Sequence, residues 1–441
     1  MTRERGAALL IGLLLLLGAA TSVFLWKANS TNVAIERERI TGDALYQAKL
    51  ALIGYAIGNQ LDNSGSLANS ARLGDLPCPD TNDDGVAETS CGNGLGSTGQ
   101  ALRLGRLPWK TLGLPDIRDG SGERLWYAVS SNFKKNTRFN QPLNSDTPGT
   151  ISVIDANGTL ILDGASDGAI AIVIAPGAPL ERPTSLLDSA PYTQTRDSTT
   201  KNNPVNYLEI GRGEDNADFL DRGSNGFISG PVIDATGLIV VNDRMMTITQ
   251  ADLAPLMEKR VVSEVERCIS LYSQSNGNRL PWMVPIASST FIGTSGTLFG
   301  RLPNPNIPGF DDTVTDSSAS MDSFWPSLPC QITASSGNNA GWFANWSDQV
   351  FVAIANNHKP ANSSPTNNCS LTGLSGPNCV QVDGTPSKQF AVIVAGAKVS
   401  GQTRPGNTAG SYLESTNATP GLNTFISSAP PPFNDVLKSA P

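Results

Sequence analysis

The sequence predicts an α+β protein in which a long N-terminal hydrophobic helix precedes two duplicated domains, each a helix packed on an antiparallel sheet. Three observations lead to this fold class. An apolar run near the N-terminus continues into an amphipathic stretch, and short motifs recur in the same order in both halves of the chain. The 43 glycines and 30 prolines among 441 residues favour short strands joined by turns.

The first element is predicted to be a transmembrane anchor over residues 7–26. The run from Ala7 to Trp26 contains no charged residue. As a helix it would be about 30 Å long, which matches the hydrocarbon core of a bilayer. Arg3 and Arg5 precede the run, which favours a cytoplasmic N-terminus and export of the rest of the chain. An ordinary signal peptide cleaved near Thr21 is the alternative.

The helical pattern is predicted to continue over residues 27–60. From Val33 to Ile57 apolar residues recur at spacings of three and four, while charged residues such as Glu36 and Lys49 occupy the other face. The N-terminal part of such a helix, which is apolar on all sides, is expected to lie in a membrane. The following part, which is apolar on one side only, is expected to pack on a domain.

This N-terminus resembles that of the type IV pilins and of the pseudopilins of type II secretion. Their short basic leader ends in glycine, as Arg3-Glu4-Arg5-Gly6 does, and an apolar helix follows. The resemblance implies a prepilin-type leader over residues 1–6, cut between Gly6 and Ala7, and a pilin-like spine. Ala7 departs from the Phe or Met that usually follows the cut. Shaft-forming members carry a glutamate at the position of Ile11. This chain lacks that glutamate, as the tip pseudopilins do.

The resemblance further implies an exported, non-enzymatic structural subunit of a type IV pilus or type II secretion pseudopilus, in a minor or tip position. Such a protein would cross the bacterial inner membrane once, with its bulk in the periplasm, and would finally stand at a filament tip or at the cell surface. Its partners would be other pilin or pseudopilin subunits, prepilin peptidase and the inner membrane. A secreted or cell-surface binding protein with a cleaved signal peptide is the alternative function.

The rest of the chain is predicted to contain two copies of one module. Five motifs recur in order, so we expect a first pilin-like, β-rich domain over residues 61–246 and a second over residues 278–441. The pairs are Gly105–Pro108 with Gly300–Pro303, Trp126–Asn132 with Val350–Asn356, Ile170–Ala175 with Phe390–Ala395, Tyr207–Glu209 with Tyr412–Glu414, and Phe227–Ser229 with Phe425–Ser427, the last followed in each copy by Asn-Asp.

A second spine-like helix is predicted over residues 247–277. Thr249 and Asp252 have the spacing of a capping box, and Asn276-Gly277 provides a C-terminal stop. Apolar residues form one stripe between these ends, and the opposite face is charged, so this helix cannot span a membrane. Within the first module, Asn157-Gly158 between two short apolar runs predicts a β-hairpin.

The six cysteines of an exported chain indicate three disulfides, with partly free thiols as the alternative. Many connectivities are possible for six cysteines. Proximity along the chain favours the pairs Cys78–Cys91 and Cys369–Cys379, which leaves Cys268–Cys330.

A calcium loop is predicted between the first two cysteines. Oxygen-bearing side chains alternate ahead of Gly85, and Ca²⁺ prefers such oxygen ligands while glycine permits the sharp turn. Cys91 stands where an EF-hand would place its bidentate glutamate, so a solvated Asx-rich turn is the alternative. The predicted ligands are Asp80, Asn82, Asp84, Val86 and Glu88.

Composition excludes several other functions. A net charge of −8 argues against a nucleic-acid-binding surface. His358 is the single histidine, which excludes a multi-histidine metal site, and its polar neighbours predict an exposed side chain. Gly164–Gly168 fits the G-x-S-x-G pattern of a nucleophile elbow, but a β-like run follows where a helix is required, so a turn is expected. No catalytic residue and no cofactor other than calcium is predicted.

Overall fold

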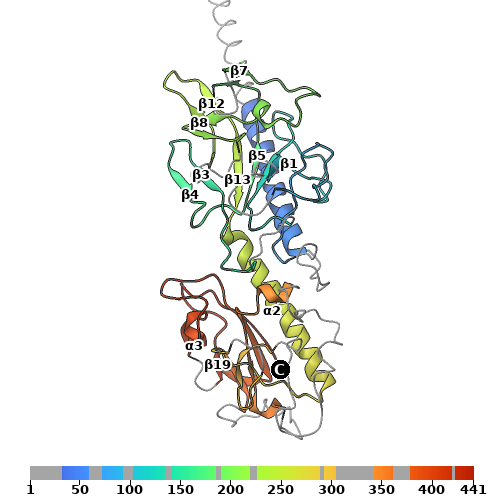
Figure 1. The fold of residues 1–441 in the computed structure, drawn as a ribbon, viewed down its shortest axis with the longest axis vertical. Coiled ribbons are helices and arrows are strands. Elements are labelled where there is room, and N and C mark those ends of the chain that lie inside the picture. Colours follow the sequence, from blue (N-terminus) through green and yellow to red (C-terminus); the bar gives the residue numbers. More distant parts are fainter. Residues whose placement is uncertain are drawn as a thin grey trace, which may run out of the picture.

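The computed structural model describes residues 32–58, 72–92, 103–135, 142–184, 190–218, 226–288, 293–303, 342–360, 378–419 and 423–441. They form two lobes stacked along the long axis of the molecule, and the helix α2 (Gln250–Ser275) runs from one lobe into the other (Figure 1). We call the described part of residues 32–248 lobe 1 and the described part of residues 276–441 lobe 2.

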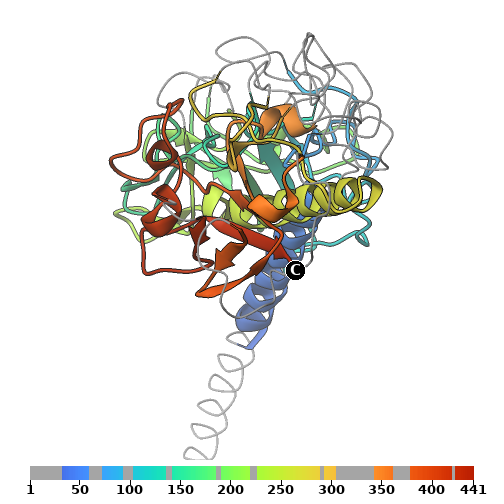
Figure 2. The ribbon, with the colours of Figure 1, turned by 90° about the horizontal axis from the view of Figure 1, so that it is seen from below.

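A first helix occupies residues 32–58 and lies along lobe 1, while in Figure 2 its N-terminal part projects from the body of the molecule. Its buried residues follow the three- and four-residue spacing of a single helical face. Because most of them are alanines, the helix axis can lie close to the sheet that it covers. The buried residues are Ala44, Leu45, Ala48, Leu52 and Ala56.

The described residues contain no long hydrophobic helix, so the predicted fold class is wrong on this point. Charged residues recur in successive turns of the first helix, among them Glu36, Arg39 and Asp43. None of the described helices is long and apolar enough to span a membrane. The predicted transmembrane character and single-pass location in the inner membrane are therefore corrected as well. The predicted anchor, residues 7–26, lies outside the described residues.

Lobe 1 is built on a four-stranded antiparallel sheet with the order β1-β2-β5-β13. Its strands are β1 (Leu104–Arg106), β2 (Trp126–Val129), β5 (Ala171–Ala175) and β13 (Arg244–Ile248). A smaller sheet has the order β10-β3-β4, formed by β10 (Gly226–Ile228), β3 (Ser152–Ile154) and β4 (Leu160–Leu162). The predicted hairpin around Asn157-Gly158 is confirmed, because β3 and β4 pair antiparallel across it.

Three two-stranded ribbons complete lobe 1. They are β6 (Glu181–Arg182) with β7 (Tyr192–Thr193), β8 (Ile210–Gly211) with β9 (Glu214–Asp215), and β11 (Val232–Ile233) with β12 (Ile239–Val241). A 3-10 turn, η2 (Pro204–Asn206), precedes the Tyr207-Leu208-Glu209 motif.

Lobe 2 repeats the plan of lobe 1. Its four-stranded antiparallel sheet has the order β14-β15-β18-β20, and its three-stranded sheet the order β17-β16-β19. In each lobe one pair of the smaller sheet is parallel, β3 with β10 and β16 with β19, and the other is antiparallel. The strands are β14 (Phe299–Arg301), β15 (Val350–Ile354), β16 (Val380–Val382), β17 (Thr385–Lys388), β18 (Phe390–Val394), β19 (Thr424–Phe425) and β20 (Val436–Ala440), with the short helix α3 (Ser415–Ala418) and the 3-10 turns η4 (Trp342–Asn345), η5 (Asn356–His358) and η7 (Ala409–Ser411).

The helix α2 has the local signals of a stable helix at both ends. The carboxylate of Asp252 accepts hydrogen bonds from the backbone N–H and the hydroxyl of Thr249, at 2.9 and 3.0 Å. Beyond Ser275, Gly277 adopts a φ of 61°, the left-handed conformation that commonly follows a helix. Its apolar stripe is buried from Leu253 to Tyr272.

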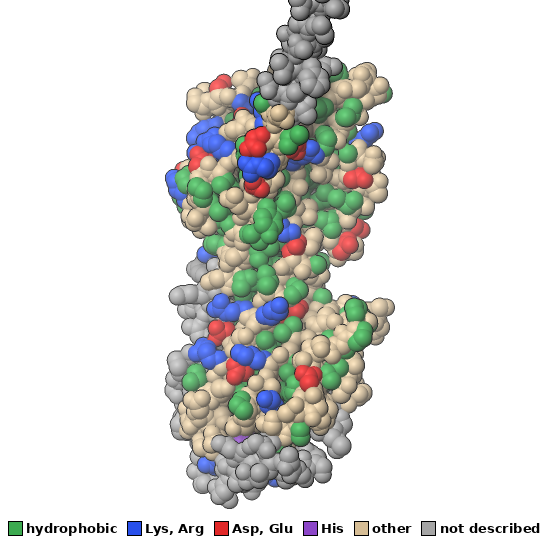
Figure 3. Space-filling model, turned by 180° about the vertical axis from the view of Figure 1, so that it is seen from behind, with side chains coloured by type: hydrophobic (Ala, Val, Ile, Leu, Met, Phe, Trp, Pro, Cys, Tyr) green, Lys and Arg blue, Asp and Glu red, His purple; other side chains and the backbone are tan. Residues whose placement is uncertain are grey.

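One hydrophobic core joins the lobes. It contains the buried face of the first helix, the inner faces of both four-stranded sheets and the buried stripe of α2. Alternate residues of each central strand face opposite sides, so Val173 belongs to this core while Ile172 and Ile174 belong to a separate cluster on the far side of the sheet. Hydrophobic side chains also run along the middle of the rear face, across the junction of the lobes (Figure 3).

Candidate functional site

The outer side of the first helix exposes several large hydrophobic residues. Ile35 is 62% exposed and Tyr46 is 55% exposed, and both lie away from the buried alanine face. Tyr46 follows Ile35 by three turns and Leu50 follows Tyr46 by one turn, so these three residues form a single stripe. Val33 and Ile40 are exposed as well, whereas the described part of lobe 2 exposes no large hydrophobic residue.

A short loop of lobe 1, residues 142–148, fastens the two lobes together. The carboxylate of Asp146 accepts hydrogen bonds from three donors of lobe 2: the backbone N–H of Lys398 at 2.8 Å, Nε2 of Gln349 at 2.8 Å and Nη1 of Arg404 at 3.0 Å. Since the guanidinium of Arg404 is only 5% exposed, this ion pair is largely shielded from water. Asp146 therefore acts as a staple between the lobes.

Two neighbours of Asp146 extend the contact. Nδ2 of Asn144 donates a hydrogen bond to the carbonyl of Asn345 at 2.9 Å, and the hydroxyl of Ser145 donates one to Glu258 of α2 at 2.7 Å. Burial raises the pKa of Glu258 to about 7. The loop therefore contacts lobe 2 through Asn144 and Asp146, and it contacts the connecting helix through Ser145.

A cavity of about 380 Å³ lies beside this loop, between the lobes. Its lining includes Arg72 and Asn132 from lobe 1 and Asp348 and Tyr412 from lobe 2. The cationic groups are already neutralised, because Arg72 pairs with Asp75 at 2.8 Å and Arg404 pairs with Asp146. The cavity therefore suits an uncharged polar molecule better than an anion.

The recurring motifs of lobe 1 meet around one buried asparagine. Nδ2 of Asn216 donates hydrogen bonds to the carbonyl of Ile228 and to Oδ2 of Asp243, at 3.0 and 2.8 Å. The same Oδ2 accepts the backbone N–H of Glu209 at 2.9 Å. Burial, reinforced by the charge of Asp243, raises the pKa of Glu209 well above its usual range, and burial raises the pKa of Asp243 to about 6.

Lobe 2 contains the same cluster. Oδ2 of Asp435 accepts the backbone N–H of Glu414 at 3.1 Å and Nδ2 of Asn417 at 3.0 Å. Asn417 also donates to the carbonyl of Ile426 at 3.1 Å. Burial, reinforced by the charge of Glu414, raises the pKa of Asp435 to about 8. These contacts explain why three motifs recur in both lobes. In lobe 2, Tyr-Leu-Glu provides Glu414, Phe-Ile-Ser provides the carbonyl of Ile426, and Asn-Asp provides Asp435.

The predicted calcium loop is held by its own side chains. The carboxylate of Asp80 is 1% exposed and accepts the backbone N–H groups of residues 82–85, with a shortest distance of 2.6 Å. Oδ1 of Asn82 accepts the N–H of Asp84, Oδ1 of Asp84 accepts that of Val86, and Glu88 accepts the hydroxyl of Thr81.

Within the described residues no three acidic, histidine or cysteine side chains are grouped so that they could hold a metal ion. Calcium binding stays a prediction, to be checked by melting the protein in calcium and in chelator. A rise in the melting temperature that Asp84→Asn abolishes would support it, and identical curves would contradict it.

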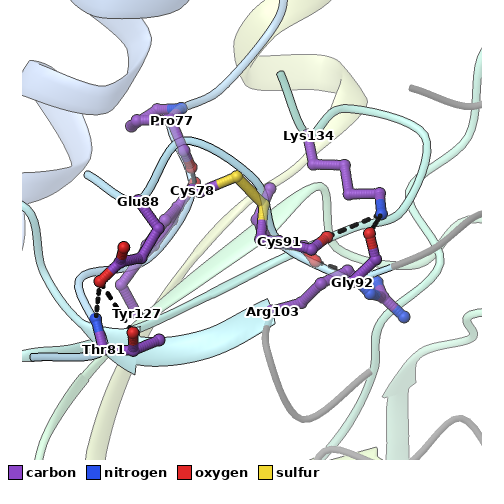
Figure 4. The surroundings of a disulfide bond; sticks show 10 residues. Pro77, Cys78, Thr81, Glu88, Cys91, Gly92, Arg103, Tyr127 and Lys134 are labelled. Carbon is purple, nitrogen blue, oxygen red and sulfur yellow. Dashed lines mark hydrogen bonds between the residues drawn. A yellow bond between two sulfur atoms is a disulfide. The ribbon is translucent and has the colours of Figure 1, made fainter. Parts of the chain in front are cut away.

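The Cys78–Cys91 disulfide closes this loop and is anchored by a buried lysine (Figure 4). Nζ of Lys134 donates hydrogen bonds to the carbonyls of Cys91 and Gly92, at 2.7 and 3.0 Å, and burial lowers its pKa to about 8. The hydroxyl of Tyr127 donates to the carbonyl of Pro77 at 3.1 Å, on the other side of the bond.

Removing this disulfide is expected to destabilise lobe 1. In Cys78→Ser/Cys91→Ser the unfolded chain regains the freedom of a loop of 13 residues. The free energy of unfolding should fall by roughly 2 kcal/mol, at the low end of the usual range because Lys134 and Asp80 also hold the loop. Urea titration of the variant and the parent measures the difference. Superimposable curves would mean that the disulfide contributes no stability.

The other predicted pairings involve residues beyond the described ranges. Cys379 is disulfide-bonded, and Cys369, its predicted partner, lies outside the described residues. Cys268 is buried on α2, and its predicted partner Cys330 also lies outside them. The predicted processing site, Gly6 and Ala7, is likewise not described.

The prediction of an exposed His358 is wrong, because the side chain is fully buried. Its Nδ1 lies 2.7 Å from the carbonyl of Asn278, to which it donates, and the backbone N–H of Leu280 donates to the carbonyl of His358 at 2.7 Å. Burial lowers the pKa of the imidazole, so His358 stays neutral. The residue joins η5 to the end of α2 and has a structural role.

No family model, no curated protein and no solved structure matches the chain.

Proposed function

We propose that the chain is a structural, non-enzymatic subunit of a pilus or of a secretion pseudopilus, in a minor or tip position, and that it assembles through its first helix. The observation that carries the proposal is the exposed stripe Ile35, Tyr46 and Leu50, on a helix whose opposite face is already buried. An exposed hydrophobic stripe with a charged border is the usual mark of a contact with another protein.

The order of the elements supports the same function. The first helix holds lobe 1 by its alanine face and leaves its outer face to a partner, while α2 and the Asp146 staple hold lobe 2 in place. Two lobes, one on the first helix and one on α2, give a bulky subunit, which suits the end of a filament better than a closely repeating shaft. The N-terminal resemblance supplies the class of assembly and a cut between Gly6 and Ala7.

The exposed stripe can be tested with one substitution and a matched control. Ile35→Glu places a carboxylate in the proposed contact, where desolvation would cost more than the isoleucine gained. We expect the amount of the chain in large complexes of its native host to fall roughly tenfold, which corresponds to about 1.4 kcal/mol. Leu238→Glu alters an equally exposed residue of the β11–β12 ribbon and should have no effect. Sedimentation of cell extracts measures both, and equal complexes in both variants would refute the proposal.

The cavity between the lobes favours a second candidate, a secreted or cell-surface binding protein for an uncharged polar ligand. Mass spectrometry of the mature N-terminus separates the two functions. A chain that starts at Ala7 supports the pilin-like subunit. A chain that starts near Thr21 supports the binding protein.

A further inference from the structure

The cavity between the lobes lies beside an arginine that occurs in both copies of the module. Nη2 of Arg196 donates a hydrogen bond to the carbonyl of Tyr207 at 3.2 Å, and Nη2 of Arg404 donates one to the carbonyl of Tyr412 at 2.6 Å. Each Nη2 also donates to the glutamine two residues earlier in the chain, at 2.9 and 2.7 Å. The two arginines therefore hold equivalent places in the two lobes.

The surroundings of the two arginines differ. Arg196 pairs with Glu123 of its own lobe at 3.5 Å, whereas Arg404 pairs with Asp146 of the other lobe. The arginine and the tyrosine are 11 positions apart in lobe 1 and 8 positions apart in lobe 2. The longer loop of lobe 1 reaches back to Arg106, whose Nη2 donates to the carbonyl of Lys201 at 2.8 Å. The cavity therefore lies where lobe 2 departs from the plan of lobe 1.

A buried glutamine in the cavity lining stands where lobe 1 has an apolar residue. Gln349 directly precedes β15 as Leu125 directly precedes β2, and the two residues are 2% and 1% exposed. Nε2 of Gln349 donates to Asp146, but its Oε1 is buried and has no hydrogen-bond partner among the described residues. A buried acceptor without a donor is costly, so this position favours a ligand that brings a donor. The neighbouring Asp348 adds an exposed carboxylate to the lining.

The rest of the lining combines apolar rings with compensated charges. Pro142, Pro148 and Pro405 are exposed and contribute rigid rings, while Arg72 and Tyr412 are buried. The guanidinium of Arg72 already pairs with a carboxylate, as that of Arg404 does. Apolar walls with a few placed polar groups are the usual composition of a small-molecule site. A matching ligand is uncharged, has C–H surface and carries adjacent hydrogen-bond donors.

We infer that this cavity binds a carbohydrate. Two adjacent hydroxyl groups of a sugar would donate to Oε1 of Gln349 and to the carboxylate of Asp348, and a C–H face of its ring would pack on the prolines. The volume of about 380 Å³ falls within the range of about 300 to 1,000 Å³ that small-molecule sites occupy. The inference rests on the second candidate function and names its class of ligand. It does not depend on the first helix.

Hydrogen-exchange mass spectrometry of the full-length chain in a mild detergent tests the inference. The probes are glucose, galactose, mannose and N-acetylglucosamine at millimolar concentrations. We expect at least one of them to slow exchange in residues 142–148 of lobe 1 and in residues 404–412 of lobe 2. Glucuronate, which adds a carboxylate to the ring of glucose, should protect both segments less, because Arg72 and Arg404 are already paired. A blocked, uncharged dipeptide should protect neither segment.

Two variants and a matched control locate the binding in the cavity. Gln349→Leu gives lobe 2 the residue that lobe 1 has at this position, and Asp348→Ala changes an exposed side chain, so neither threatens the fold. Each should raise the Kd for the sugar roughly tenfold through the loss of one hydrogen bond. Gln274→Leu, at an exposed position of α2 outside the cavity lining, should leave the Kd unchanged.

Three results would overturn the inference: protection by none of the four sugars, protection by the dipeptide alone, or the same Kd in the parent, Gln349→Leu and Asp348→Ala. The assembly function is judged separately. Ile35→Glu should bind the sugar as the parent does, because Ile35 lies outside the cavity lining. Failure of sugar binding therefore leaves assembly through the first helix standing, and unchanged complexes in Ile35→Glu leave sugar binding standing.

Discussion

Asp146→Ala is expected to separate the two lobes. The substitution removes the only carboxylate that the loop 142–148 offers to lobe 2, and it leaves the buried guanidinium of Arg404 without that acceptor. Losing a charge-assisted hydrogen-bond network of this kind costs about 3 kcal/mol. We therefore expect the unfolding curve to split into two transitions, with lobe 2 unfolding first.

The radius of gyration from solution scattering provides a second readout, because loosened lobes sample more extended arrangements. Asp167→Ala is the matched control, since Asp167 is an exposed turn residue of lobe 1 and such changes stay within about 0.5 kcal/mol. A single unfolding transition and an unchanged radius in Asp146→Ala would show that the shared hydrophobic core alone holds the lobes.

Asp435→Asn is expected to stabilise the protein at alkaline pH. The folded pKa of Asp435 is raised to about 8, so the folded state holds a proton that the unfolded chain has already released. This contribution is complete below the unfolded pKa, near 4, and is lost as the pH rises through 8. Stability should therefore decline across that range by on the order of 5 kcal/mol.

In the variant, an uncharged amide takes the place of the protonated carboxyl group at every pH. Oδ1 of Asp435 has no hydrogen-bond partner among the described residues, while its Oδ2 accepts two donors. An asparagine can keep the accepting oxygen and direct its NH₂ group toward Glu414. Thermal melts between pH 5 and pH 9 should show a flatter pH dependence for Asp435→Asn. Asp155→Asn, at an exposed turn, is the control, and equal destabilisation by Asp435→Asn at both pH values would contradict the prediction.

The sequence predicted those features that depend on neighbours along the chain. The start of α2 follows from Thr249 and Asp252, the β3–β4 hairpin from Asn157-Gly158, and the first disulfide from the short separation of its cysteines. Each of these features depends on residues that are close together in the chain, so a short sequence pattern predicts it.

Features that depend on distant segments could not be predicted in this way. Asp146 and Arg404 lie 258 residues apart and belong to loops without periodicity, so no pattern connects them. His358 has polar neighbours typical of an exposed loop, yet the chain after α2 returns to bury it. The recurring Tyr-Leu-Glu and Asn-Asp motifs could be recognised in the sequence. The asparagine between them, Asn216 or Asn417, could not, because its distance along the chain from these motifs differs between the two copies.

The most direct test of assembly through the first helix is a photo-cross-linking amino acid placed at position 35 of the full-length chain in its native host, with position 238 as the control. The account predicts covalent adducts with other assembly subunits or with a second copy at position 35, and none at position 238. Adducts at position 238 alone, with none at position 35, would contradict it.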